Sequence, residues 1–166
     1  YPNSIKPGLS QMTIGEADAW QARTANQRGS AAAGRYQFMY IKDQAALAGI
    51  GPNEVFSPEN QDRMAIALIE KKRKVTLDMV ENDPTEAARR LAMEWAGLPV
   101  LERTRGNKRT VEAGQSYYSG DGRNKATINP SELKGAFSKA GGAEAQEPQP
   151  QPQPEPQEPP KNNKMT

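Results

Sequence analysis

The sequence predicts a mainly α-helical domain, and two observations support this fold class. First, three segments open with a capping residue followed directly by proline, at Ser57-Pro58, Asp83-Pro84 and Asn129-Pro130. A capping side chain bonds to free backbone amides at a helix start, and proline suits the first helical position. Second, apolar residues recur at helical spacing after each start, whereas strand-like alternation is almost absent. We therefore expect five helices and almost no sheet.

The first two helices are expected over roughly residues 14–23 and from residue 37 or 38 to 49. Residues 1–12 are expected to be irregular because Pro2, Pro7 and Gly8 interrupt regular structure. Thr13, with Glu16 three residues on, forms a capping box that begins the first helix. Residues 24–34 are then expected to be a loop. The second helix carries an apolar stripe and stops at glycines: Phe38, Ile41, Ala45 and Ala48, then Gly49 and Gly51.

The other three helices begin at the capped prolines. Glu59 lies in the first turn after Ser57, where the helix dipole favours a negative charge, and Glu86 takes the capping-box position after Asp83. The helix after Asn129 has Glu132 at that position and is expected to end at Gly141. The buried faces of the first two of these helices are expected to be Met64, Ala65, Leu68 and Ile69, and Ala87, Leu91, Ala92, Trp95 and Leu98.

The composition divides the chain into a folded domain over residues 1–140 and a tail over residues 141–166. Seven of the 14 prolines lie between Pro148 and Pro160, interleaved with Gln and Glu. Such a segment is an extended, solvated chain, and we interpret it as a disordered spacer. Recognition by a partner with an aromatic groove is the alternative, but the segment has no PxxP core with flanking basic residues. The chain opens in loop-type sequence without Met, so we expect it to begin partway through a longer protein with further domains.

The residue types exclude several chemistries. The 166 residues include no Cys and no His, which excludes disulfides, cysteine nucleophiles, Ser-His-Asp triads and the usual Cys/His metal sites. Any catalysis must then rest on Asp, Glu, Lys, Arg, Tyr, Ser or Thr, and carboxylate chemistry is the natural candidate. The net charge of +2 suits an anionic partner such as bacterial wall polymer, but is too small for a nucleic-acid binder. No apolar run approaches the ~18 residues of a membrane span.

Three blocks, read in order, carry a resemblance to a known family. They are SAAAGRYQFMYIKDQAALAGIG, FSPENQDRMAIALIE and AARRLAMEWAGLP, and GQSYYSGDGRNKA follows them. Together they resemble the bacteriophage lambda lysozyme family, whose members include the lytic transglycosylases of phage endolysins and of virion-associated lysis proteins. The resemblance implies an α+β, lysozyme-like fold, in which helices surround a glycan cleft and a small irregular or β lobe supplies one wall.

The resemblance also implies a reaction. These proteins cleave the β-1,4 bond between N-acetylmuramic acid and N-acetylglucosamine in peptidoglycan and leave a 1,6-anhydro sugar. The sugar's own 6-hydroxyl is the nucleophile, so one Glu that first donates and then accepts a proton is sufficient. The resemblance implies the peptidoglycan glycan strand as the partner, and it implies neither a cofactor nor a metal.

The chain departs from the family where that acid is expected. In the family the Glu belongs to a Glu-Ser motif that precedes the YPNS region, whereas this chain begins at Tyr1. We therefore expect the catalytic Glu to lie upstream. Two carboxylates are weaker stand-ins: Glu94, whose neighbours Met93 and Trp95 suggest an apolar setting, and Asp62, which more simply either bonds locally or pairs with Arg35.

Candidate substrate-binding residues cluster in the first block. Gly34 lets the backbone approach a sugar closely, and Gln37 offers both a donor and an acceptor to an N-acetyl group. Tyr36 either stacks on a sugar or fills the wall, and Ser30 either bonds substrate or caps the loop. The remaining assignments are Tyr117 and Tyr118 for sugar stacking, and Arg35, Asp62 and Trp95 for structural support.

Two functions from different classes follow. The first is a phage muramidase that acts as a lytic transglycosylase, carried in the virion or made in the host cytoplasm, and acting on the cell wall in the periplasm. The second is a non-catalytic peptidoglycan-binding or structural virion module that keeps the cleft and lacks the acid.

Overall fold

A computed structural model describes residues 8–29 and 31–144. The fold is mostly helical with one small antiparallel sheet, which agrees with the expected α+β, lysozyme-like class. The helical elements are η1 (Leu9–Gln11), α1 (Ile14–Arg28), α2 (Ile41–Leu47), α3 (Pro58–Ala67), the π-helix η2 (Leu68–Lys72), α4 (Leu77–Asn82), α5 (Pro84–Glu94) and α6 (Pro130–Glu144). The strands are β1 (Thr104–Arg105) and β2 (Thr110–Val111), paired with Thr104 opposite Val111.

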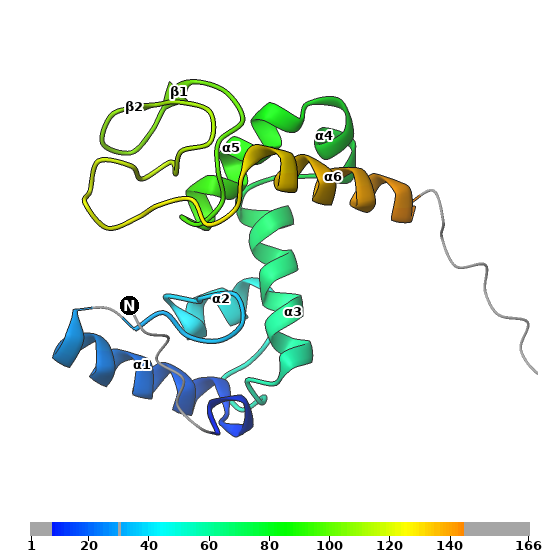
Figure 1. Cartoon of the computed structure of the whole chain (residues 1–166). Coiled ribbons are helices and arrows are strands. Elements are labelled where there is room, and N and C mark those ends of the chain that lie inside the picture. Colours follow the sequence, from blue (N-terminus) through cyan, green and yellow to red (C-terminus); the bar gives the residue numbers. More distant parts are fainter. Residues whose placement is uncertain (1–7, 30, 145–166) are drawn as a thin grey trace, which may run out of the picture.

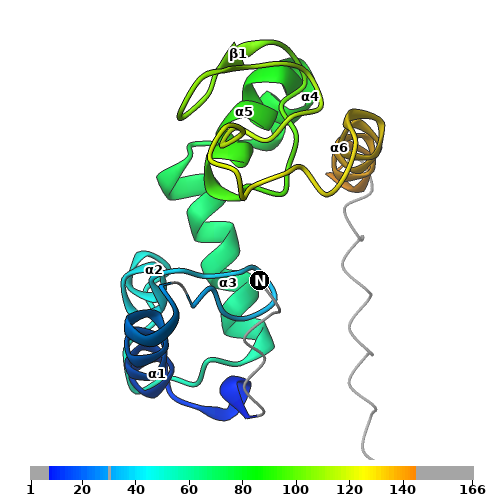
Figure 2. The same cartoon turned by 60° about the vertical axis from the view of Figure 1, so that its left-hand side comes forward.

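The elements form two groups that α3 and η2 connect. Figure 1 shows α1 and α2 beside the first part of α3, while α4, α5, α6 and the β1–β2 hairpin gather at the other end. The view turned by 60° shows the same separation (Figure 2). We call residues 8–67 the N-terminal lobe and residues 73–144 the C-terminal lobe.

Each lobe has its own apolar core. The N-terminal core is built around Phe38, Phe56 and Met64, all fully buried, with Tyr36 and Trp95 at its edge. The C-terminal lobe holds three smaller clusters, centred on Val75, Leu101 and Val100. Trp95 packs against the N-terminal core and also against the cluster around Val75. This one indole therefore contacts the cores of both lobes.

Four of the five predicted helix starts are confirmed by their caps, whereas the second helix begins at Ile41 rather than at residue 37 or 38 and has no side-chain cap. Thr13 and Glu16 form both halves of the capping box of α1, and the Ser57 side chain accepts a bond from the amide of Asn60. Asn129 and Glu132 bond reciprocally in front of α6. At α5 only half of the expected box exists. Asp83 accepts a bond from the Glu86 amide, but the Glu86 carboxylate turns to two arginines instead.

The predicted helix ends were less accurate. Helix α1 continues to Arg28, so the loop expected from residue 24 begins later. Helix α2 covers only Ile41–Leu47, because residues 33–38 form a separate turn. Helix α6 passes through Gly141 to Glu144, although glycine is a common stop. The short helix α4 was not predicted, since none of its residues is buried and it has no apolar stripe.

Candidate functional site

The candidate site is built on a tight turn, Gly34–Gln37, between α1 and α2. The flanking residues Ala33 and Phe38 exchange two backbone hydrogen bonds of 3.0 and 2.8 Å, which close the turn. Gly34 has a φ of 78°, and a Cβ there would lie 2.5 Å from Gln61 Oε1 and 3.1 Å from the Phe56 ring. Only glycine fits this position without displacement, so the backbone does approach a neighbour closely. The groups that the Gly34 backbone approaches are Gln61 and Phe56, which belong to the protein itself.

Two buried glutamines hold the turn in place. The Gln21 side chain, on α1, donates to the carbonyls of Ala31 and Phe38 and accepts from the Ile41 amide. The Gln61 side chain, on α3, accepts from the Arg35 amide at 3.0 Å and donates to the Phe56 carbonyl. Each residue is only 5% exposed. The sequence did not reveal these roles, because a single glutamine in a helix carries no local signature of a distant partner.

Tyr36 is fixed by Asp62. Its hydroxyl donates to Asp62 Oδ1 at 2.6 Å, and this bond, followed by burial, raises the pKa of Tyr36 above its usual value of 10.0. The expected pairing of Arg35 with Asp62 is wrong. Arg35 is exposed, and its guanidinium instead lies 5.9 Å from the centre of the Tyr36 ring. Asp62 therefore bonds to the turn, as expected, but its partner is the Tyr36 hydroxyl and not the Arg35 guanidinium.

Gln37 is, with Arg35, one of the two exposed residues of the turn. Its φ of 54° is left-handed, and its amide donates to the Gly34 carbonyl at 3.1 Å. Within residues 8–29 and 31–144, no protein group donates a hydrogen bond to its side-chain oxygen. Gln37 therefore presents an acceptor in a fixed orientation, which is what recognition of an N–H group requires.

Trp95 connects this turn to the C-terminal lobe. It follows the last residue of α5, and its indole N–H donates to the carbonyl of Tyr36 at 2.9 Å. The two residues are 59 positions apart in the chain. The sequence favoured Trp95 as a core residue, and it does pack at two cores, but it also holds the turn Gly34–Gln37 against the end of α5.

Glu94 does not have the apolar setting that the sequence suggested. Its side chain is 6% exposed and pairs with Arg73 Nε at 2.8 Å and with Lys72 Nζ at 3.0 Å. Both cations come from the end of η2 and the residue after it. The carboxylate is therefore committed to an ionic cluster that joins α5 to η2.

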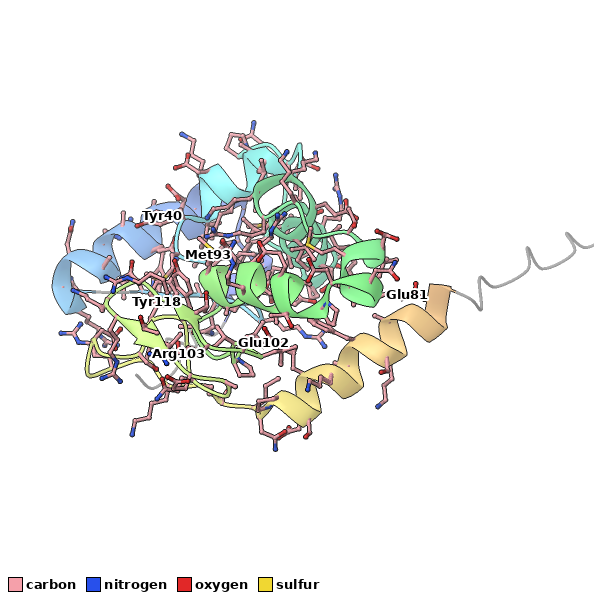
Figure 3. The ribbon with its side chains drawn as sticks, turned by 90° about the horizontal axis from the view of Figure 1, so that it is seen from above. Tyr40, Glu81, Met93, Glu102, Arg103 and Tyr118 are labelled. Carbon is pink, nitrogen blue, oxygen red and sulfur yellow. The ribbon has the colours of Figure 1, made fainter. Side chains whose placement is uncertain are left out.

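Tyr118 lies beside the same cluster, and Tyr117 packs on it edge to face with ring centres 5.2 Å apart. The Tyr118 hydroxyl donates to the Met93 carbonyl, and burial is the main cause that raises the pKa of Tyr118. Figure 3 labels Tyr118 and Met93 close to each other, seen from above. Both tyrosines are half-buried, so each keeps part of its surface for a ligand. Ser30, the remaining candidate, lies outside the described residues.

Two cavities are described, and both belong to the C-terminal lobe. The larger, of about 550 Å³, is lined by the loop of residues 114–126 together with Arg109. The smaller, of about 190 Å³, lies between the start of α5 and residues 100–104. Neither is lined by Gly34–Gln37, so the glycan cleft that the resemblance implies does not correspond to either of these two cavities.

Over residues 8–29 and 31–144, no three acidic side chains gather as a metal site would require. In the same part of the chain, no helix combines the length and apolar character needed to cross a membrane.

One comparison with known proteins gives a result. A family model described as Endolysin matches residues 18–143, which is well over half of the chain and includes the turn, Trp95 and the loop of residues 114–126. No curated protein matches the chain, and no solved structure does.

Proposed function

This chain belongs to the endolysin family, the phage proteins that degrade the peptidoglycan of the bacterial cell wall, and from that premise we propose that it is the glycan-binding part of a lytic transglycosylase. The bond cleaved is the β-1,4 bond between N-acetylmuramic acid and N-acetylglucosamine. The product carries a 1,6-anhydro end, as in the lambda lysozyme family that the sequence resembles.

The observation that carries this proposal is the fixed turn Gly34–Gln37. Gln21 and Gln61 anchor it, and Trp95 ties it to the other lobe. Its exposed amide, Gln37, has one donor engaged at the Gly34 carbonyl. We assign its oxygen to the N–H of an N-acetyl group, and Tyr36, Tyr117 and Tyr118 to the sugar faces alongside.

The carboxylates near this face support an acid outside the described residues. Asp62 accepts the Tyr36 phenol, and Glu94 is held by two cations. Glu86, with a pKa lowered to about 2 mainly by its hydrogen bond from Arg89, is already ionised at neutral pH and has no proton to give. We propose that the full-length protein supplies the Glu from a segment before Tyr1. That Glu would protonate the leaving oxygen and then take the proton of the sugar 6-hydroxyl.

Digestion of purified sacculi tests this reaction. The full-length protein is expected to release fragments with 1,6-anhydro ends, which mass spectrometry detects as lighter by one water than hydrolysed ends. The 166-residue chain is expected to bind sacculi and release none. Hydrolysed reducing ends from the full-length protein would contradict the transglycosylase assignment, and anhydro products from this chain alone would contradict the upstream acid.

The second function, a non-catalytic peptidoglycan-binding module of the virion, is favoured by the same carboxylates. It predicts binding without any product from the full-length protein. In either case we propose a phage protein carried in the virion or made in the host cytoplasm, with residues 145–166, which follow α6, as a spacer to further domains.

A further inference from the structure

We propose that the loop of residues 114–126, with Arg109, is a binding site for the carboxylates of the peptide that branches from the glycan strand. This inference rests on the proposed function, because it names a second part of the same polymer. We call this hollow the loop cavity. It measures about 550 Å³, within the usual range of ligand pockets.

Three cations line the loop cavity. Arg109 comes from the residue before β2, and Arg123 and Lys125 come from the loop itself. All three are exposed, and none forms an ion pair within the part of the chain that the structure describes. Neutral hydrogen-bonding side chains complete the lining: Gln115, Ser116, Ser119 and Asn124. Separate cations interleaved with amides and hydroxyls suit a peptide with several carboxylates better than a single compact anion.

The nearby carboxylates only partly neutralise these cations, because Asp121 lies close enough to Arg123 for their charges to attract. Residues 102–126 contain six basic and three acidic residues. Glu112 pairs with Arg103, on the hairpin. Asp121 accepts the backbone amides of Arg123 and Asn124, each at 2.8 Å, and these bonds lower the pKa of Asp121. The loop cavity is therefore left with a positive field that attracts anionic groups.

The loop is anchored at both ends to the segment that carries Trp95. At its start, the Gly114 amide donates to the Val100 carbonyl at 2.9 Å, and at its end the Thr127 amide donates to the Gly97 carbonyl at 2.8 Å. Between these points, Tyr118 bonds to the Met93 carbonyl. The loop cavity thus adjoins the stretch 93–100, which also fixes the turn Gly34–Gln37 through Trp95. A peptide branching from a glycan bound at the turn can reach these cations.

Calorimetry on the 166-residue chain tests the assignment with four probes. They are a disaccharide–peptide fragment with free carboxylates, the same fragment with its carboxylates amidated, a neutral N-acetylglucosamine tetramer and an oligomer of glycerol phosphate. The double variant Arg109→Gln/Arg123→Gln removes two cations from the loop cavity, and Lys125→Gln is a second, milder variant. The matched control Arg105→Gln/Lys108→Gln removes the same amount of charge from the neighbouring β1–β2 hairpin, outside the lining.

The double variant is expected to raise the Kd for the free-carboxylate fragment about tenfold, the size of one charge-assisted contact. Lys125→Gln is expected to raise it in the same direction, and the control is expected to leave it unchanged. The amidated fragment is expected to bind the unaltered chain as weakly as the free fragment binds the variant. Equal losses in the variant and the control, or tighter binding of glycerol phosphate than of the peptide fragment, would overturn the proposal.

The neutral tetramer separates this inference from the proposed function. It is expected to bind the unaltered chain, the variants and the control alike. If the tetramer binds but free and amidated fragments bind equally, only the loop cavity assignment fails. If the tetramer does not bind the unaltered chain, the proposed glycan face fails, while a loss confined to the double variant would still support the loop cavity.

Discussion

At the scale of single residues, Gly34 shapes the turn that presents Gln37. Its left-handed backbone and the contact with Gln61 both require a residue without a side chain. The tight approach brings the Arg35 amide to Gln61 Oε1, and the neighbouring phenol reaches Asp62. A glycine in a polar loop here serves packing within the protein, and we propose that Gln37 is the residue of the turn that faces the ligand.

We expect Gly34→Ala to lower the free energy of unfolding by about 2–4 kcal/mol, because backbone strain adds to a clash with a buried amide. The matched control is Gly49→Ala. Gly49 has a similar φ of 74° but open space around it, so only the strain of about 1 kcal/mol is expected. Urea unfolding of both variants measures the difference, and equal losses would contradict the packing role of Gly34.

The sequence predicted part of this residue-level arrangement. It placed Asp62 beside the turn Gly34–Gln37 but chose Arg35 as the partner, because guanidinium–carboxylate pairs are common and the backbone direction was unknown. Gln21 was not predicted, since its partners lie 10 to 20 positions away. Ion pairs such as Glu94 with Arg73 depend on how α5 packs on η2, which the flanking residues Met93 and Trp95 did not indicate.

At the scale of the elements, Glu86 connects α5 to the end of η2. Its carboxylate accepts from Arg89 at 2.6 Å and from Arg90 at 3.0 Å. Arg90 in turn donates to the carbonyls of Arg73 and Lys74. Lys74 has a φ of 56°, which turns the chain between η2 and α4. Glu86 therefore orients Arg90, whose guanidinium bonds to the chain at Arg73 and Lys74, between η2 and α4.

This arrangement predicts a pH dependence. The pKa of Glu86 falls from 4.5 to about 2 on folding, so its stabilisation is complete above pH 4.5 and is lost as the pH falls toward 2. Glu86→Gln is expected to cost about 1–2 kcal/mol at pH 7, after allowance for solvent screening of a partly exposed pair, and much less near pH 2.

Urea unfolding at the two pH values checks this expectation. The control is Glu81→Gln on α4, an exposed residue for which no ion pair occurs among the described residues. A penalty for Glu86→Gln that is equal at both pH values would show that the ionised form is not what stabilises the fold.

Helix starts could be predicted from the sequence because caps are local. Thr13, Ser57, Asp83 and Asn129 each bond within three residues, so their pattern is visible in the chain. Helix ends and short helices depend on packing. The extension of α1 to Arg28 and the exposed helix α4 had no apolar period to indicate them.

At the scale of the whole molecule, Trp95 joins two lobes that otherwise have separate cores. It packs on both, and its indole bonds to the Tyr36 carbonyl at 2.9 Å. The Lys71 ammonium adds a second connection, from η2 to the Leu47 carbonyl at the end of α2. The position of the turn Gly34–Gln37 relative to α5 therefore depends strongly on the Trp95 side chain.

Trp95→Phe keeps most of the apolar contact but leaves the Tyr36 carbonyl without its donor. We expect a loss of about 1–2 kcal/mol in unfolding free energy, and weaker binding of the N-acetylglucosamine tetramer. Trp20→Phe is the control, because the Trp20 ring packs on the N-terminal core alone and its indole forms no hydrogen bond among the described residues. Weakened glycan binding in the control and not in Trp95→Phe would contradict a role for the lobe connection.

The central claim is that a glycan strand binds at the face formed by the turn Gly34–Gln37 and the end of α5. The most direct test is amide NMR of the 166-residue chain titrated with the N-acetylglucosamine tetramer. We predict shift changes at Gly34, Gln37, Tyr118 and the Trp95 indole, and at least severalfold weaker binding of Gln37→Ala with its unfolding free energy unchanged. Shift changes confined to other parts of the molecule, or none at all, would contradict the account.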